Sequence, residues 1–458
     1  MRPQPIIHRR TVLLGGVSIG LGTLGAGVAA ASRKASTLAS FGARGDNDTD
    51  DTAALVRALT DYTGDLVVGA GTYRYRRTLQ VRGSGRRVRF EGGAVLVGDD
   101  PSVSGLEIRN LSGVTLSGVS LAWRREPRQR IRFGAGVLVM GCTDLHVDHV
   151  AVEGFGGAGL LFESCIRPVV SGARVRKTLA DGVHFANCSQ SLAEDVDCQH
   201  TGDDGLAFVN YQRLPDGTGG TARRIVIANS AARGISVVGQ SDVSVSDFNI
   251  TRTRASGIYV AQEASYATRT PRNTSFENGR VDQAGVLEGP GGNRCGAELV
   301  HCHDASLSGI TITRSGSRLV GVHGATGTVR LLNLTLKDND AGEGVHLSSS
   351  EHVVMRGGEV ANAFNTGLYA KDVDTLEVSG VDFSACAERG ASRTAVWLEN
   401  IRELRGHLGR VDASPARPDP ARVVLRRIGS GAFSTAQRTG RRASVQTEAS
   451  PALAMETR

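Results

Sequence analysis

The sequence predicts an all-β protein, a right-handed, single-stranded parallel β-helix of about 12 coils of about 23 residues each. Three observations predict this fold. A short strand pattern recurs at a fixed interval, apolar and polar residues alternate within each unit, and the chain has 59 glycines but only 5% aromatic residues. A fixed period of this size indicates a solenoid, in which each unit buries its apolar face only by stacking on its neighbours.

The repeat unit opens with a glycine followed by alternating apolar residues, as in Gly182-Val-His-Phe. Alternation with period two indicates a β-strand that has one buried face. A unit of 23 residues is too short for a strand–helix–strand crossover, but it accommodates three short strands and three turns. We therefore expect each strand to pair with its counterpart one unit later, about 4.8 Å away. The pattern recurs every 23 residues within three blocks, at Gly136, Gly159, Gly182 and Gly205, at Gly234 and Gly257, and at Gly321, Gly344 and Gly367.

Two interior columns follow from this repeat. The residue after each glycine, such as Val183, is expected to point into the core. Cys142, Cys165 and Cys188 are also 23 residues apart, and we expect them to stack inside the coil as small, soft side chains. A redox role is the alternative interpretation of this column. Since the seven cysteines form neither a CxxC motif nor a Cys/His cluster, neither a metal nor another cofactor is expected.

The N-terminus has the features of an export signal. Arg9 and Arg10 precede an apolar, glycine-rich run that ends in Ala29-Ala-Ala, so residues 1–31 are predicted to be a signal peptide of the twin-arginine type. An ordinary secretory signal is the alternative. We therefore expect the twin-arginine export machinery as a partner, no stable membrane span after signal removal, and a periplasmic or secreted protein.

The remaining boundaries follow from where the repeat is strong. Residues 32–104 are predicted to form an N-terminal cap and entry strands, including a short helix after Asp50-Asp51. The parallel β-helix repeats are expected over residues 105–409. Residues 410–458, which are rich in Pro, Arg, Ser and Thr, are predicted to be a basic tail that is extended or disordered.

The formal charge of +7 does not indicate a nucleic-acid partner. Residues 1–31 carry +3 and residues 410–458 carry +5, which leaves −1 on the body of the chain. A nearly neutral body lacks the basic surface that binds phosphate backbones. Nucleic acid is therefore excluded as an expected partner.

The segment Phe41-Gly-Ala-Arg-Gly-Asp-Asn-Asp-Thr-Asp-Asp-Thr-Ala-Ala, followed by Gly71-Thr-Tyr, resembles the entry segment of the pectate lyase and polygalacturonase superfamily. This resemblance implies a pectin-lyase-like β-helix that binds, cleaves or modifies polysaccharides. Together with the signal, the repeat also looks like a family of twin-arginine-exported β-helix repeat proteins.

A second resemblance is local and concerns four successive turns of polygalacturonases. The family's Asp-Gly and Gly-Asp-Asp turns match Asp181-Gly182 and Gly202-Asp-Asp-Gly205. Its Gly-His-Gly turn is replaced here by Ala232-Arg233-Gly234, and its Arg-x-Lys strand is absent from Gly257-Ile-Tyr259-Val. The resemblance implies that Asp203 is the general acid of an inverting hydrolase, and that Asp181 and Asp204 hold the attacking water.

The repeat itself places these carboxylates together. Asp181 and Asp204 each immediately precede a repeat glycine, so they occupy one column in adjacent coils, and Asp203 is next to them. Three carboxylates this close cannot all ionise readily, and at least one pKa should rise. One protonated and one ionised carboxyl group are what glycoside hydrolysis requires. An Asp-Gly turn of purely structural origin is the alternative interpretation.

Other residues are candidates for binding an acidic sugar. Lys177, His200 and Arg252 each lie five residues before a repeat glycine, so we expect them beside the carboxylate turns. Arg233 is expected directly above Asp204, and Tyr259 faces outward, where its ring could stack on a sugar. Insertions at 212–223 and between Gly257 and Ala297 are expected to build the functional rim.

Three functions remain open at this point. The first is a hydrolase of a uronate-containing or related polysaccharide, which uses Asp181, Asp203 and Asp204. The second is a polysaccharide lyase or epimerase, in which the aspartates hold calcium and Arg233 works near the abstracted proton. The third is a glycan-binding or envelope-structural protein without catalysis.

The twin-arginine interpretation predicts that Arg9→Lys/Arg10→Lys strands the precursor in the cytoplasm, because this pathway depends on the arginine pair. Cell fractionation with detection of the precursor and the mature chain measures the outcome. A variant with Arg2→Lys is the matched control and should be exported normally. Normal export of the double variant would assign the chain to the general secretory route.

Overall fold

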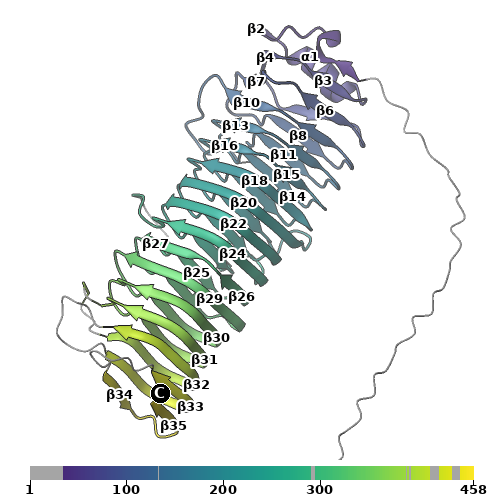
Figure 1. The fold of residues 1–458 in the computed structure, drawn as a ribbon. Coiled ribbons are helices and arrows are strands. Elements are labelled where there is room, and N and C mark those ends of the chain that lie inside the picture. The colour runs from purple at the N-terminus through teal and green to yellow at the C-terminus, as the bar shows by residue number, and fades with distance from the viewer. Residues whose placement is uncertain are drawn as a thin grey trace, which may run out of the picture. The chain divides into compact units, whose positions relative to one another are not determined.

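The computed structural model describes residues 35–132, 134–289, 294–387, 389–390, 394–412, 422–435 and 444–457. Almost all of their regular structure is parallel β-strand, wound into a stack of coils (Figure 1). The predicted parallel β-helix is therefore confirmed. The predicted signal peptide lies outside the described residues.

Three strand ladders run along the stack, and every strand pairs in parallel with its counterpart one coil away. In the first ladder, Val137 pairs with Leu160, which pairs with Val183, which pairs with Leu206, each 23 residues after the last. We call this the site ladder. It comprises β5 (Leu79–Val81), β8 (Leu106–Arg109), β11 (Val137–Met140), β14 (Leu160–Glu163), β17 (Val183–Ala186), β19 (Leu206–Val209), β21 (Ile235–Val238), β23 (Ile258–Ala261), β25 (Ala297–Val300), β28 (Val320–His323) and β34 (Ser444–Glu448).

Two further ladders complete each coil, and toward the C-terminus single long strands run through successive ladders. The second ladder contains β1 (Ser36–Thr37), β3 (Leu66–Val68), β6 (Arg87–Phe90), β9 (Thr115–Ser117), β12 (His146–Asp148), β15 (Val169–Ser171), β26 (His303–Ser308) and β35 (Leu453–Thr457). The third contains β2 (Asp46–Asp50), β4 (Gly71–Tyr75), β7 (Ala94–Gly98), β10 (Ser120–Trp123), β13 (Ala151–Glu153), β16 (Arg174–Arg176) and β27 (Thr311–Ser315). The long strands are β18 (Ser191–Gln199), β20 (Thr218–Ser230), β22 (Ser241–Thr253), β24 (Arg272–Asp282), β29 (Thr326–Asn339), β30 (Val345–Ala361), β31 (Leu368–Ser384), β32 (Thr394–Asp412) and β33 (Arg422–Thr435).

The stack has about 16 turns, so the expected number of about 12 coils is too low. The additional turns lie outside the region of the strong glycine repeat. Residues 36–98 already form strands β1 to β7. At the other end, β33 and β34 lie within the segment predicted to be a tail, where β33 pairs with β34 and with the preceding β32. These coils lack the repeat glycine, so the spacing of glycines alone could not reveal them.

Within the residues that the structure describes, helical structure is confined to short segments. The predicted capping helix forms as α1 (Thr52–Val56), which continues into one turn of π-helix, η2 (Arg57–Asp61), and it buries Leu55 and Leu59 against the first coils. Two short 3-10 segments complete the set, η1 (Leu38–Phe41) and η3 (Ala264–Tyr266). None of the helices in the described part of the chain has the length and apolar character needed to cross a membrane.

The interior is filled by stacked columns of identical or similar side chains. Cys142, Cys165 and Cys188 are buried with free thiols, as their spacing predicts. The rings of Phe162 and Phe185 stack with centroids 5.1 Å apart, and those of Phe185 and Phe208 are 5.3 Å apart. Because each side chain packs on the same residue type one coil away, the column adds contact area at a constant spacing.

The repeat glycine is required by close approach of the backbone. A Cβ atom on Gly182 would lie 2.4 Å from the carbonyl oxygen of Gly205, and one on Gly159 would lie 2.7 Å from that of Gly182. Both distances are shorter than any real contact of a Cβ atom, so another residue would push the coils apart. Residues next to these glycines are thereby held at the coil spacing of about 4.8 Å.

One block of the repeat has a different register from the one its glycine predicts. Gly321 pairs with Glu298 on one side and His346 on the other, so it occupies an outward position rather than the glycine column. In this coil the glycine column is occupied by Leu319, because Val320 pairs with Val345, the residue after Gly344. Val322 still points inward and is buried, since a shift of two residues preserves the face of a strand.

The register predicts that the protein tolerates loss of a whole coil better than loss of half of one. Deleting residues 344–366 joins Glu343 to Gly367 and keeps every column aligned, because Val345 pairs with Leu368. Deleting only residues 344–355 removes part of a coil and breaks all three ladders. Circular dichroism and thermal melting should show a cooperative β-transition for the first variant and a far lower melting temperature for the second. Equal losses would contradict the repeat assignment.

Candidate active site in a carboxylate-lined cleft

Three carboxylates meet at the start of two adjacent strands of the site ladder. Asp181 precedes Gly182 and β17, whereas Asp203 and Asp204 precede Gly205 and β19. The backbone N–H of Asp204 donates a hydrogen bond to Asp181 Oδ1 at 3.1 Å. One oxygen from each of the three side chains lies within 4.8 Å of the others. The repeat therefore brings the three predicted carboxylates together.

Each carboxylate contacts its own cationic partner. His184 Nδ1 lies 2.7 Å from Asp181 Oδ2, and Arg130 Nη1 lies 2.7 Å from Asp203 Oδ2. The backbone N–H of Arg233 donates to Asp204 Oδ1 at 2.9 Å, and its guanidinium lies 3.8 Å from the same oxygen. Arg233 is thus placed above Asp204, as its position in the repeat predicts.

His184 and Arg130 are site residues that the sequence analysis did not identify. His184 stands two residues after Gly182, at an outward position of β17, so the alternation within the strand contained the signal for it. Arg130 comes from the loop between β10 and β11, outside the repeat, and no pattern in the sequence connects it to a turn 73 residues later.

Burial and the neighbouring charges separate the pKa values of the three carboxyl groups. Burial, together with Asp181 and Asp203, raises the pKa of Asp204 to about 7, although Arg233 opposes the shift. Burial and Asp181 also raise the pKa of Asp203 against the effect of Arg130. Burial of Asp181 is outweighed by the attraction of His184 and Arg130, which hold its pKa below the usual value. The site therefore contains an ionised carboxylate beside a carboxyl group that is protonated up to neutral pH.

The protonation of His184 follows from the same pairing. Burial favours the neutral ring, but Asp181, Asp204 and Asp203 outweigh it and raise the pKa of His184. The side chains of Asp181 and His184 are only 10% and 12% exposed, so water screens their interaction weakly. The pairing therefore favours the protonated ring of His184, which orients Asp181 through the contact with its Oδ2 atom.

Two adjoining clefts open on the carboxylates. One has a volume of about 270 Å³ and is lined by all three aspartates together with Arg130, His184 and Arg233. The other, of about 400 Å³, shares Arg130, Asp181, His184 and Tyr211 with the first. It adds Arg132 and Arg213, so cationic side chains dominate its polar lining. Together they are large enough for a ligand of several sugar units.

The walls come from the insertions that interrupt the repeat, as expected. Residues 210–217 supply Tyr211 and Arg213, and residues 262–271 supply Glu263, Tyr266 and Thr268. Buried Asn187 fixes the first loop, because its Nδ2 donates to the carbonyl oxygens of Tyr211 and Pro215 at 2.9 and 2.8 Å. The backbone N–H of Gln212 donates to the carbonyl oxygen of Ala267 at 2.9 Å and joins the two loops.

Tyr259 supports the cleft from the next coil. The guanidinium of Arg233 lies over its ring, with 4.3 Å from Cζ to the ring centroid, while Nη2 pairs with Glu263 Oε1 at 2.7 Å. Tyr259 is not among the residues that line either cleft. Its ring therefore packs against Arg233, and the expected stacking on a sugar stays a prediction.

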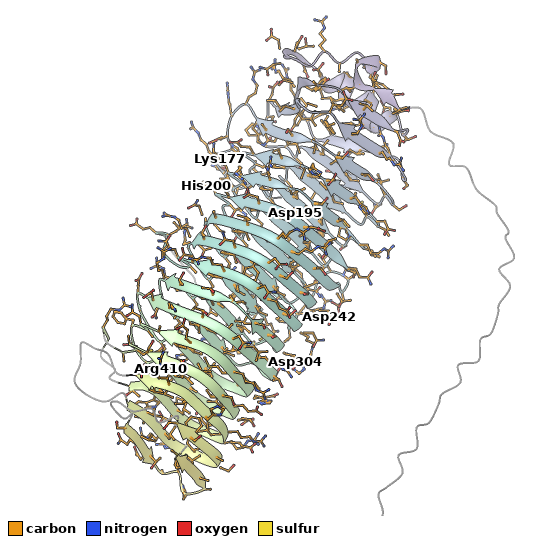
Figure 2. The ribbon with its side chains drawn as sticks, in the orientation of Figure 1. Lys177, Asp195, His200, Asp242, Asp304 and Arg410 are labelled. Carbon is orange, nitrogen blue, oxygen red and sulfur yellow. The ribbon has the colours of Figure 1, made fainter. Side chains whose placement is uncertain are left out.

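Lys177, His200 and Arg252 do form one column, but the structure does not bring them to the carboxylates. All three have left-handed backbone, with φ of 53°, 56° and 57°, at the corner that ends the third ladder. Figure 2 shows Lys177 and His200 side by side at this corner. Lys177 pairs with Glu126 and Glu153, Arg252 contacts Asn229, and none of the three lines either cleft. The corner between strand and turn directs them to solvent, which a count of residues could not show.

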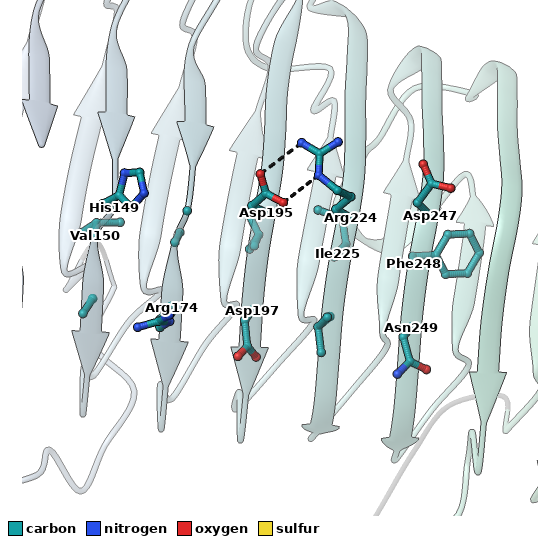
Figure 3. A pocket seen from close by; sticks show the side chains of 15 residues that line it. His149, Val150, Arg174, Asp195, Asp197, Arg224, Ile225, Asp247, Phe248 and Asn249 are labelled. Carbon is teal, nitrogen blue, oxygen red and sulfur yellow. Dashed lines mark hydrogen bonds and ion pairs between the residues drawn. The ribbon is translucent and has the colours of Figure 1, made fainter. Parts of the chain in front are cut away.

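A larger cleft, of about 720 Å³, lies away from the carboxylates along another corner of the coils (Figure 3). His149, Asp195, Arg224 and Asp247 supply one left-handed residue per coil there. Arg224 Nε binds Asp195 Oδ1 at 2.7 Å across the coils, so these two charges are paired with each other. Among the described residues, the cluster of three carboxylates is the one formed by Asp181, Asp203 and Asp204, and we assign the functional site to the smaller clefts for this reason.

The carboxylate cluster is a poor fit for a divalent cation. Three carboxylate oxygens within 4.8 Å of one another are a suitable donor set by themselves. However, Arg130, His184 and Arg233 already contact these oxygens, and a calcium ion would be repelled by all three. We therefore derive no step through a metal.

Residues 37–259 match the family model described as rhamnogalacturonase A/epimerase, pectate lyase-like. This region contains β2 to β22, all three aspartates and their cationic partners. No curated protein matches the chain.

Three solved structures of low sequence identity are similar to this chain. The catalytic unit of a GH87 α-1,3-glucanase from Streptomyces thermodiastaticus is 15% identical, covers 92% of this chain and 69% of its own, and has a TM-score of 0.56. A family 28 exopolygalacturonase from Yersinia enterocolitica (15% identity, 84% and 79% covered) has a TM-score of 0.49. The A-module of mannuronan C-5 epimerase AlgE6 from Azotobacter vinelandii (15% identity, 92% and 98% covered) has a TM-score of 0.46. Over residues 37–259 the chain is therefore similar to the pectate lyase-like family, and its fold is a parallel β-helix.

Proposed function

We propose that the protein is an exported hydrolase of a polysaccharide, acting at the Asp181, Asp203 and Asp204 cluster. One observation carries the proposal: neighbouring carboxyl groups in an open cleft have pKa values shifted in opposite directions. Glycoside hydrolysis needs one carboxylic acid to protonate the leaving oxygen and one carboxylate to activate water. The family match, to enzymes described as rhamnogalacturonase A and epimerase, supports a polysaccharide as substrate.

The roles divide according to charge. Asp181, ionised and oriented by His184, is the base that takes a proton from the attacking water. Asp204, protonated up to a pH of about 7, is the acid, and this role differs from the one implied by the resemblance, which gives the acid to Asp203. Asp203 is paired with Arg130 and helps to keep the proton on Asp204 by its negative charge. Arg233 anchors Asp204 through its backbone N–H.

The cationic lining supports an acidic sugar as part of the substrate. Arg130, Arg132 and Arg213 face the 400 Å³ cleft from two loops. Guanidinium groups bind carboxylates with two parallel hydrogen bonds, so a uronate unit matches this lining. We propose a uronate-containing glycan on this basis, and the signal-like N-terminus supports its encounter outside the cytoplasm.

A polysaccharide lyase or epimerase is the second candidate, favoured by the epimerase in the description of the matching family. Both reactions require a base for the proton next to a uronate carboxylate. The phenol of Tyr211 lines both clefts, but burial and Asp181 raise its pKa to about 12, so it stays protonated at neutral pH. The ionised carboxylate of Asp181 is the stronger candidate base, and it serves hydrolysis directly.

Replacement of the acid should abolish turnover. Asp204→Asn keeps the hydrogen-bond acceptor for Arg233 but cannot donate the proton, so kcat should fall by about 10²–10⁴-fold. Activity of the wild type should fall as the pH rises through about 7, since Asp204 then ionises. Reducing-sugar release from polygalacturonate, rhamnogalacturonan, mannuronan and α-1,3-glucan measures both effects. An unsaturated product with new ultraviolet absorbance would indicate the lyase instead.

Asp197→Asn is the matched control for these assays. Asp197 pairs with Arg176 at 2.6 Å and lines only the 720 Å³ cleft, so its loss should leave kcat unchanged. If wild type and both variants bind a glycan equally and release no product, the hydrolase proposal is wrong and the non-catalytic binding protein replaces it.

The cluster also predicts how stability depends on pH. The pKa of Asp204 is raised on folding, so its protonated form favours the folded state below a pH of about 4, and this contribution is lost as the pH rises to about 7. Asp204→Asn should therefore flatten the decline in melting temperature between these pH values, and at pH 7.5 it should melt at or above the wild type. Asp247→Asn, on an exposed corner, should reproduce the wild-type profile. A lower melting temperature for Asp204→Asn at pH 7.5 would contradict the assigned repulsion.

A further inference from the structure

A second carboxylate–histidine pair lies on the site ladder, far from the first. Glu343 precedes Gly344 as Asp181 precedes Gly182, and His346 follows three residues later as His184 does. His346 Nδ1 lies 3.1 Å from Glu343 Oε2. The sequence Glu343-Gly-Val-His346 therefore repeats, in chemistry and geometry, the sequence Asp181-Gly-Val-His184.

The neighbouring coils add a cation and a row of rings. Arg318 Nε donates to Glu343 Oε2 at 3.0 Å from the coil before. The ring centroids of His323 and His346 are 5.1 Å apart, and those of His346 and Tyr369 are 5.0 Å apart. Trp397 pairs with Tyr369 in the next coil, in the same outward register. All of these side chains are half-buried on one face, with part of each ring open to solvent.

The register of Gly321 contributes to this arrangement. Its outward position would place a Cβ atom 3.1 Å from Nε2 of His323. The absence of a side chain therefore leaves room for the His323 ring to lie against His346. The shift that moves Gly321 out of the repeat column therefore makes room for the first ring of this row, that of His323.

The chemistry of this second group differs from that of the cleft. The hydrogen bond from His346 and the contact with Arg318 outweigh burial and lower the pKa of Glu343 to about 2. Burial and the neighbouring His346 and Arg318 lower the pKa of His323 to about 4, so its ring is neutral. The carboxyl group of Glu343 therefore lacks the raised pKa that a general acid requires, and the neutral ring of His323 has no proton to donate as an acid. The group is suited to binding rather than to hydrolysis.

We propose that Arg318, Glu343, His346, Tyr369 and Trp397 form a second glycan-binding site, the ring platform, which holds the same polysaccharide chain whose other part occupies the carboxylate cleft. The ring faces offer apolar area for the C–H face of a pyranose, and the charged groups at their rim can bind its hydroxyl groups. This inference rests on the proposed polysaccharide substrate.

The position of the ring platform supports the same occupant. His346, Tyr369 and Trp397 project from β30, β31 and β32, whereas Arg318 and Glu343 come from the turns before β28 and β30. These strands continue the site ladder that contains β17 and β19. Five coil steps separate Asp204 from Glu343, a distance of roughly 24 Å along the axis. A polymer lying along this face can contact both sites, whereas a short oligosaccharide in the cleft cannot reach the platform. The two sites together should then act with an increased effective concentration.

The test uses the full mature chain with Tyr369→Ala/Trp397→Ala, and compares polymer with oligosaccharide. Migration in native gels containing polygalacturonate, rhamnogalacturonan, mannuronan or α-1,3-glucan measures polymer binding. Loss of two stacking rings should weaken retardation by about tenfold in apparent affinity for the polymer that retards the wild type. On that polymer KM should rise by a similar factor with kcat unchanged, and on its trisaccharide both constants should match the wild type.

Two controls separate binding from folding. Tyr369→Phe keeps the ring and should bind as the wild type does. Ile166→Ala removes an exposed apolar side chain from a column of isolated bridges outside the three ladders. Melting temperatures of all variants show whether the coils are intact. If the double variant fails to fold, His346→Gln in the same assay takes its place, because it removes the central ring of the row and the partner of Glu343.

The outcomes distinguish this inference from the proposed function. If Asp204→Asn abolishes hydrolysis but the double variant keeps the wild-type gel retardation and KM, the ring platform is refuted and the hydrolase stands. If no glycan is hydrolysed but retardation depends on Tyr369 and Trp397, the hydrolase is refuted and the platform stands. Absence of retardation of the wild type by every polymer refutes the platform.

Discussion

The contact between successive coils at the repeat glycine is the constraint on which the rest of the structure depends. At this column the backbone of one coil approaches the carbonyl oxygen of the next so closely that no Cβ atom fits. The contact sets the register of the site ladder, and with it the columns on either side of the glycine. Residues just before the glycine become neighbours along the axis although they are 23 residues apart in the chain.

The electrostatics of the cleft follow from that spacing. Stacking Asp181 and Asp204 one coil apart, with Asp203 adjacent, produces repulsion that only protonation or cationic partners relieve. The structure uses both, since Arg130, His184 and Arg233 contact the three carboxylates and Asp204 still keeps a raised pKa. Cations from outside the column are needed, and the loops that interrupt the repeat supply Arg130 and the walls of the cleft.

The parts of this arrangement that lie in the repeat could be predicted from the sequence, and the parts outside it could not. Period and alternation located β17, β19, the cysteine column and the three aspartates, because parallel stacking converts sequence spacing directly into position. Arg130 and Tyr211 come from irregular loops, whose path depends on contacts such as those of Asn187. Lys177, His200 and Arg252 were aligned correctly as a column, but their left-handed backbone directs them away from the cleft. Gly321 shows the limit of the pattern itself, because a glycine at the expected interval occupies the wrong column.

The stacked rings of Phe162, Phe185 and Phe208 lie beneath the coils that carry the carboxylates. Phe185 follows Asp181 by four residues and Phe208 follows Asp204 by four. Each of these aspartates therefore lies just before the strand that contains one of the buried rings. The hydrogen bonds between the coils set their separation, and the aromatic column packs at that separation. Coulomb interactions in the cleft would change if a loss of this packing let the coils move. The acidity of the cleft is thus partly a property of the hydrophobic interior. Exchanging a buried phenylalanine for a smaller residue would retune a proton affinity on the surface without altering any charged group.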